Sequence, residues 1–101
     1  MSLPLKRFKV LDLSRLAAGN MVSHMLADYG ADVIKVEKPG KGDDLRNWKV
    51  KNVSHWWHVY SRNKRSIALD FKSDIGIDIL KELIKSSDIF IENFVPGTLE
   101  K

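Results

Sequence analysis

A chain of 101 residues, 44% of them hydrophobic and 30% charged, has the composition of an ordinary globular protein and is long enough for one small domain. It has no apolar run near the roughly 20 residues of a membrane span, and Asp12 and Arg15 interrupt the region where a signal peptide would be apolar. We therefore expect a cytoplasmic protein without a membrane partner. The sequence has no cysteine, which excludes disulfides, thiolate ligands and a cysteine nucleophile, and its three histidines lack metal-ligand spacing, so we expect no metal.

The positive charge is concentrated in the middle of the chain. Residues 35–72 hold ten Lys or Arg against four Asp or Glu, so this window carries +6 and the remainder of the chain −2. Four of these cations lie in the segment RNKRSIALDFK at residues 62–72. A small anionic partner would fit this charge, as would RNA or another polyanion, and an ordinary solvated surface explains it equally well.

The first half of the chain predicts a βαβ unit. Residues 8–13 form a short apolar run, which is typical of a strand buried on both faces. A helix is predicted from about Ala18 with Gly30 as its left-handed stop, and a second strand over residues 31–37 alternates around Lys35. A right-handed crossover would make the two strands parallel neighbours. The apolar residues at helical spacing are Met21, Val22, Met25, Leu26 and Tyr29.

The second half predicts two more strands and a helix after a long polar loop. A third strand is expected over residues 66–71 and a fourth over 88–92. Between them, residues 74–86 predict a helix capped by Ser73 or Asp74. Together the elements predict a three-layer α/β fold with a Rossmann-like, mostly parallel sheet. The apolar face of the later helix would consist of Ile75, Ile79, Leu80, Leu83 and Ile84.

Ligands of such sheets bind beyond the carboxyl ends of the strands, which here are residues 14–20, 38–44 and 93–97. All three segments carry glycine or cations. The first reads SRLAAGN, with one glycine instead of the three of a dinucleotide fingerprint, so NAD is not expected. The second contains GKGDD without the Gly-Lys-Ser/Thr of a Walker loop, so nucleotide hydrolysis is not expected either.

Three segments carry a resemblance to a known family: AAGNMVSHMLADYGADVIKVEKPGKGDD at residues 17–44, RNKRSIALDFK at 62–72 and IENFVPG at 91–97. They resemble the N-terminal part of the family III CoA-transferases, which include formyl-CoA transferase, carnitine CoA-transferase and α-methylacyl-CoA racemase. The resemblance covers residues 10–101, and family members are several times longer than this chain. It implies that residues 1–101 are a truncated N-terminal part of the family's large domain.

The resemblance also implies which residues contact coenzyme A. This ligand carries phosphates, an adenine ring and a pantetheine arm, so its site needs cations, a flat apolar slot and a groove. Leu16 and Leu69 would wall the adenine. Lys38 stands where formyl-CoA transferase has an arginine near the adenine, and it lacks that residue's planar guanidinium. The positions that match the family's CoA pocket are Leu16, Ala17, Lys38, Leu69, Lys72, Asn93, Phe94 and Lys101.

The other matched positions would meet the phosphates and the pantetheine. By resemblance, Lys72 and Lys101 approach the phosphates, while Asn93 and Phe94 flank the nucleotide and the pantetheine. Lys101 again replaces a guanidinium, and Asn20 stands where family members usually have proline. These departures imply an altered affinity for CoA or a drifted copy of the gene.

Each matched position also has a plainer explanation. Leu16 and Leu69 would belong to the core of any α/β domain, and single lysines are mostly solvated. Asn93 would serve as a turn former before the Pro-Gly sequence, and Phe94 would close the edge of the sheet. The ligand interpretation depends on their joint occurrence at the family's spacing.

The family's reaction, as the resemblance implies it, is nucleophilic covalent catalysis. An aspartate attacks an acyl-CoA thioester to form a mixed anhydride, and CoA then passes to a second carboxylic acid. That aspartate lies downstream of this chain, because Asp12, Asp28 and Asp70 match scaffold positions. We therefore assign no catalytic residue here and expect the 101-residue chain alone to be inactive.

Two other functions stay open. One is an acyl-CoA racemase of the same fold, and the other is a truncated, non-catalytic protein that binds CoA or a polyanion. Family members form interlocked homodimers, so a homodimer is expected for the complete protein, with Trp56 and Trp57 as packing or subunit contacts. Although these tryptophans lie near the basic segment, we do not expect nucleic acid to be the partner.

Overall fold

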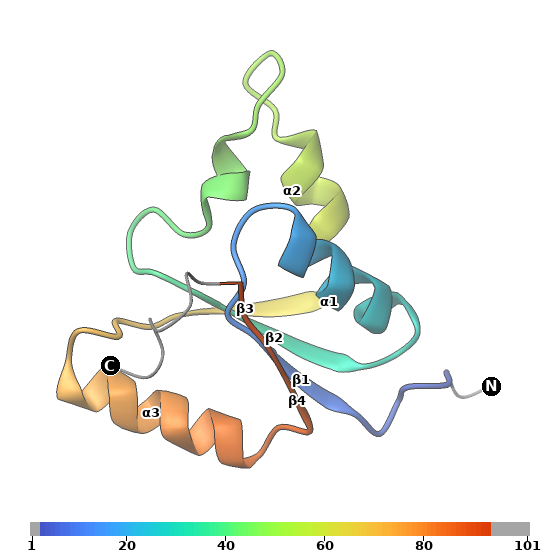
Figure 1. Cartoon of the computed structure of the whole chain (residues 1–101). Coiled ribbons are helices and arrows are strands. Elements are labelled where there is room, and N and C mark those ends of the chain that lie inside the picture. The colour runs from blue at the N-terminus through green and yellow to red at the C-terminus, as the bar shows by residue number, and fades with distance from the viewer. Residues whose placement is uncertain (1–2, 94–101) are drawn as a thin grey trace.

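The computed structural model describes residues 3–93, which form a four-stranded sheet with every pair of strands parallel (Figure 1). The strand order is β3-β2-β1-β4. The strands are β1 (Lys9–Asp12), β2 (Asp32–Glu37), β3 (Lys64–Ala68) and β4 (Ile89–Ile91). The expected α/β class and the parallel pairing of the first two strands are therefore confirmed.

Two long helices cover opposite faces of the sheet (Figure 1). Helix α1 (Ala18–Asp28) connects β1 to β2, and α3 (Asp74–Lys85) connects β3 to β4. Side chains alternate along β1, so Val10 packs with Ala27 of α1. Leu11, the next residue, faces the other way and belongs to the cluster against which Leu80 and Leu83 of α3 pack. The fold thus has three layers.

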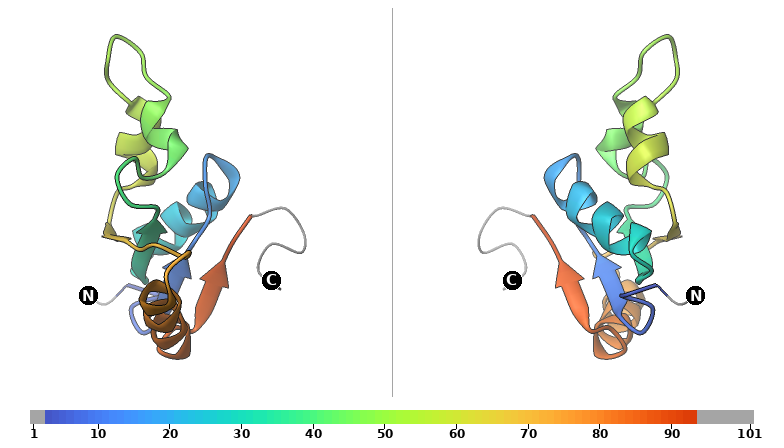
Figure 2. Two further views of the ribbon diagram at one scale, coloured as in Figure 1. Left: turned by 90° about the vertical axis from the view of Figure 1, so that its left-hand side faces the viewer. Right: turned by 90° about the vertical axis from the view of Figure 1, so that its right-hand side faces the viewer.

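A smaller substructure stands beyond the carboxyl edge of the sheet, where Figure 2 shows it projecting from the sheet and its two long helices. It consists of the 3-10 helix η1 (Asp44–Asn47) and helix α2 (His55–Tyr60). The sequence predicted a loop here, because a helix of six residues is too short to show apolar periodicity. Ser54 begins α2, and its hydroxyl accepts a hydrogen bond from the Trp57 amide at 3.3 Å.

The third strand begins and ends earlier than the predicted range of 66–71. Its pairing with β2 starts at Lys64, and a last hydrogen bond from the Leu69 amide to the Glu37 carbonyl follows the end of the strand. Asp70 then forms a turn, since its carboxylate accepts from the Lys72 amide at 2.9 Å. Ser73 caps α3 by accepting from the Gly76 amide at 3.0 Å, which decides between the two predicted caps.

Helix α1 turns its polar side toward the sheet. The apolar residues that predicted this helix lie mostly outward, with Met25 55% and Tyr29 57% exposed, and only Leu26 of that set packs on the core. Glycine at position 19 permits this close approach, because a Cβ there would lie 2.1 Å from the Ser14 Cβ. The buried residues of α1 are Gly19, Asn20, Ser23 and Ala27.

Candidate functional site

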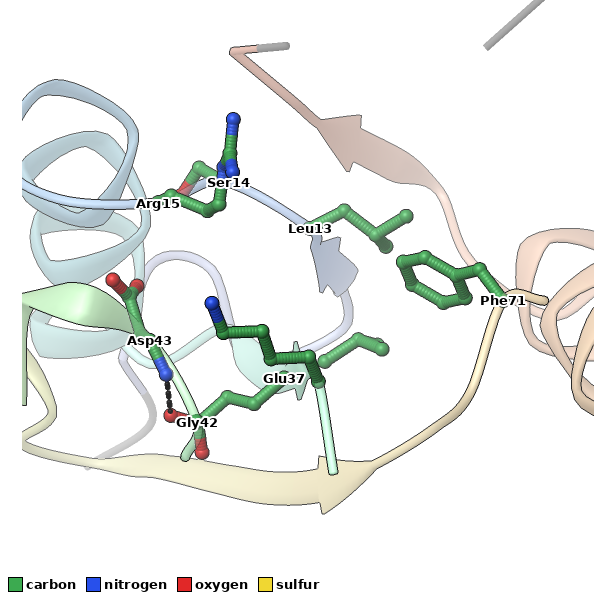
Figure 3. Close-up of a pocket in the computed structure, with 9 residues that line it drawn as sticks. Leu13, Ser14, Arg15, Glu37, Gly42, Asp43 and Phe71 are labelled. Carbon is green, nitrogen blue, oxygen red and sulfur yellow. Dashed lines mark hydrogen bonds between the residues drawn. The ribbon is translucent and has the colours of Figure 1, made fainter. Parts of the chain in front are cut away.

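A pocket of about 190 Å³ lies where the carboxyl ends of β1 and β2 meet the segment that follows β3. Figure 3 shows Leu13 and Phe71 on one side of it and Glu37 and Asp43 on the other. Its volume is below the roughly 300–1,000 Å³ of small-molecule sites, so it can hold only part of a large ligand. The lining residues are Leu13, Ser14, Arg15, Val36, Glu37, Lys38, Gly42, Asp43 and Phe71.

A buried ion pair supports the floor of this pocket. The Lys35 ammonium lies 2.7 Å from an Asp43 carboxylate oxygen, and both side chains are only 1% exposed. Lys35 also donates to the Ser14 carbonyl. Lys35 points from β2 toward α1, so the position that interrupts the apolar strand pattern carries a cation that joins β2 to two loops at the edge of the sheet.

The Asp43 carboxylate is held in its charged form by donors from several loops. It accepts hydrogen bonds from the Leu16 amide at 3.0 Å and the Leu45 amide at 2.9 Å. Burial alone would raise the pKa of Asp43, but these amides, together with Lys35 and Asn20, outweigh burial and lower it. Asp43 therefore acts as a fixed anion that organises the loops and is not a candidate acid or base.

Glu37, at the end of β2, is equally saturated. Arg46 donates to its two oxygens at 2.8 and 2.9 Å, and the Asp43 amide donates at 2.9 Å (Figure 3). The Ser66 hydroxyl also donates to Glu37. Burial opposes ionisation, but these donors lower the pKa of Glu37 to about 2. With both carboxylates compensated, the rim cations Arg15 and Lys38 are what the pocket offers to an anionic ligand.

A second, more open hollow of about 250 Å³ shares Glu37, Lys38 and Gly42 with the pocket. Lys38 lies at this junction, 52% exposed, and its only ion pair within the described residues is a loose one of 3.6 Å to Asp44. Such an exposed pair is worth little, so Lys38 can exchange Asp44 for a ligand phosphate at small cost.

The basic turn between α2 and β3 is largely neutralised by acidic residues. Arg62 donates to both oxygens of Asp28 at 3.2 and 2.6 Å, and Arg65 to both oxygens of Asp32 at 2.8 and 2.7 Å. Lys64 is 2% exposed, and burial, opposed by nearby Asp12, lowers its pKa to about 8. These contacts weaken the case for a polyanion-binding surface at this turn.

The residues predicted to contact CoA converge on the carboxyl edge to different degrees. Lys38 lines the pocket, while Leu16 and Ala17 directly follow the lining residue Arg15. Lys72 directly follows Phe71 and is exposed, with no side-chain hydrogen bond or ion pair among residues 3–93. Phe94 and Lys101 lie outside the described residues.

Two predicted residues have structural roles. Leu69 is 6% exposed and packs in the core on the α3 side of the sheet. Asn93 accepts from the Arg15 amide at 2.9 Å and donates to the Arg15 carbonyl at 2.8 Å, which ties the end of β4 to the loop after β1. Asn93 thus lies at the correct edge and stabilises a loop that borders the pocket.

Four pocket residues were missed by the sequence reasoning. Arg15 and Phe71 directly follow predicted apolar runs, and a cation or aromatic residue just beyond a strand was the available signal. Glu37 and Asp43 gave no such signal, because their compensation by Arg46 and Lys35 depends on tertiary contacts.

Within residues 3–93, no three His, Asp or Glu side chains are grouped so that they could hold a metal ion. The helices in this part of the chain are all too short or too polar to cross a membrane.

A parallel sheet with helices on both faces and a pocket across its carboxyl edge defines a Rossmann-like, ligand-binding α/β class. The description of CoA-transferase family III matches residues 5–101. The chain therefore belongs to CoA-transferase family III. This finding confirms the resemblance drawn from the three sequence segments.

Relatives with named activities are similar over nearly the whole chain. It is 46% identical to succinyl-CoA–D-citramalate CoA-transferase of Chloroflexus aurantiacus and 48% identical to human succinyl-CoA:glutarate CoA-transferase. These alignments cover 97% and 95% of the chain but only 25% and 23% of the relatives. The crystal structure of a CaiB/BaiF family protein from Brucella suis superposes with a TM-score of 0.91 at 40% identity, covering 99% of this chain and 28% of that one.

Proposed function

We propose that this chain is the N-terminal part of the large domain of a cytoplasmic CoA-transferase, in which it supplies part of the CoA site. The complete enzyme would move CoA from an acyl-CoA thioester to a carboxylic acid. The observation that carries the proposal is the strand-edge pocket, where two carboxylates are internally compensated and Arg15 and Lys38 stand at the rim. The similar relatives named above are all CoA-transferases, which favours a transferase over a racemase.

The proposed site would contact one end of CoA. A pocket of about 190 Å³ is too small for the whole ligand, so its pantetheine arm would extend into protein contributed by other parts of the complete enzyme. Lys38 and Lys72 are the exposed cations that would meet the phosphates. We keep Leu16, Ala17, Asn93, Phe94 and Lys101 as proposed contacts, while the core position of Leu69 favours an indirect role.

The nucleophile of the proposed reaction would lie elsewhere in the complete enzyme. An aspartate oxygen would attack the thioester carbonyl and expel the CoA thiolate, giving a mixed anhydride, before CoA passes to the acceptor acid. Asp12 and Asp43 are buried among hydrogen-bond donors, and Asp28 is paired with Arg62. Their occupied oxygens support the proposal that this chain binds and does not turn over substrate by itself.

Replacing Lys72 by alanine in the full-length enzyme should weaken the binding of acyl-CoA. Loss of one charge-assisted phosphate contact costs about 1–3 kcal/mol, which is roughly 5- to 150-fold in KM. The contact would be equally strong in the ground and transition states, so kcat should stay within about threefold. Steady-state kinetics would measure both constants. Lys85→Ala is the matched control because Lys85 is 74% exposed on α3, and an equal rise in KM for this control would contradict the assignment.

Calorimetric titration distinguishes the CoA site from the polyanion-binding alternative. The full-length protein should bind CoA more tightly than RNA at physiological salt, and dephospho-CoA should bind more weakly if a lysine meets the terminal phosphate. Tighter binding of RNA with a steep salt dependence would replace the transferase proposal with a polyanion-binding function.

The full-length protein is also expected to be a homodimer. The outward side of α1 carries exposed apolar residues, and Trp56 is 47% exposed on α2, so this side of the chain has apolar surface available for burial. Sedimentation at micromolar concentration should show a dimer. A monomer would contradict the expectation without affecting the CoA site.

A further inference from the structure

Leu16 adopts a strained backbone conformation next to the pocket. Its φ of +60° lies in the left-handed region, which costs a residue other than glycine about 1–3 kcal/mol unless the surroundings impose it. The residue before it, Arg15, lines the pocket, so the direction of the Leu16 backbone decides where the rim of the pocket lies.

Both polar groups of the Leu16 backbone are held by side chains. Its amide donates to Asp43 at 3.0 Å, and its carbonyl accepts from the side-chain amide of Asn20 at 2.5 Å. The same nitrogen of Asn20 donates to the second Asp43 oxygen at 2.8 Å. Leu16, Asp43 and Asn20 therefore form a closed ring of three hydrogen bonds, which we call the Leu16 clamp.

Asn20 is completely buried, and every hydrogen-bonding function of its side chain is used. Its oxygen accepts from the Lys64 ammonium at 3.2 Å, while its nitrogen makes the two bonds of the clamp. Lysine can only donate and a carboxylate can only accept, so these neighbours fix the orientation of the amide. One side chain thus joins the loop after β1 to the loop after β2 and to β3.

We infer that Asn20 is a positioning residue of the proposed CoA site, acting through Leu16 to hold the Arg15 rim in place. The inference rests on the proposed function for the identity of the ligand, but the clamp itself is a property of the free protein. Proline, alanine or aspartate at position 20 could not make both donor contacts. Asn20 is therefore a functional part of this chain's pocket.

The test uses Asn20→Ala and Asn20→Ser in the full-length enzyme. A serine hydroxyl has one donor hydrogen and cannot serve both Leu16 and Asp43, so it removes the clamp while leaving a polar group for Lys64. Hydrogen exchange of the Leu16 amide in the free protein should become about tenfold faster in either variant. KM for acyl-CoA should rise about 5- to 20-fold, with kcat within about threefold.

Ala27→Gly is the control, because it weakens the same helix at a buried position away from the loop. It should leave KM and Leu16 exchange unchanged. Unchanged exchange in both Asn20 variants would overturn the clamp, and faster exchange with an unchanged KM would overturn the positioning role. An equal KM change in Ala27→Gly would also overturn it. Failure of the wild-type enzyme to bind CoA would instead refute the proposed function, which the wild-type titration detects separately.

Discussion

Replacing Lys35 by methionine should lower the free energy of unfolding of the full-length protein by about 3–5 kcal/mol. The change leaves Asp43 as a buried charge without its cation, at a position where both side chains are 1% exposed. Such a loss is a large part of the roughly 5–15 kcal/mol that stabilises a typical protein. Urea-induced unfolding followed by circular dichroism would measure it.

A double-mutant cycle separates the ion pair from the other contacts of these residues. Asp43→Asn removes the charge but keeps an oxygen for the Leu16 and Leu45 amides. The double variant with Lys35→Met should be more stable than the sum of the single losses predicts, by about 1–3 kcal/mol. Lys85→Met, on an exposed surface, should change stability by less than about 0.5 kcal/mol. Strict additivity would show that the pair contributes no coupling.

Acid should destabilise the protein partly through Glu37. The pKa of Glu37 falls from its ordinary 4.5 to about 2 in the folded state, so its stabilising contribution is complete above pH 4.5 and disappears as the pH falls toward 2. The difference corresponds to about 3 kcal/mol. Glu37→Gln should therefore be less stable at neutral pH by that order, and its unfolding curve should depend less on pH between 4.5 and 2.

The control for this pH dependence is Glu82→Gln, since Glu82 is 74% exposed on α3. Its stability should follow that of the wild type at every pH. If the Glu37→Gln and wild-type stabilities stayed parallel between pH 4.5 and 2, the carboxylate would not be held by Arg46 and Ser66 as the structure describes.

The order of the main elements was predictable because each carries a local signal. Short apolar runs marked the strands, and Gly30, with a φ of +106°, ended the first helix as expected. The orientation of α1 was not predictable in this way. Its apolar residues suggested a sheet-facing stripe, whereas the helix buries its small and polar side against the charged ends of β1 and β2.

The position of the site was also predictable, but its charge was not. Strand ends and cations placed Lys38 at the carboxyl edge. The compensation of Glu37 by Arg46 and of Asp28 by Arg62 joins residues 9 and 34 positions apart, and no local pattern records such pairs. The surplus of positive charge counted along the chain therefore overstated the charge available to a polyanion.

The polar inner side of α1 limits how this helix can move. A helix docked by apolar contacts can slide or rotate by a few degrees at little cost, because the hydrophobic effect has no direction. Helix α1 instead docks through hydrogen bonds of Ser23 with Asp12 and of Asn20 with Lys64 and Asp43, and hydrogen bonds weaken steeply when their angles change. The first crossover is therefore a rigid reference from which the edge of the sheet is built, whatever protein surface covers its apolar exterior.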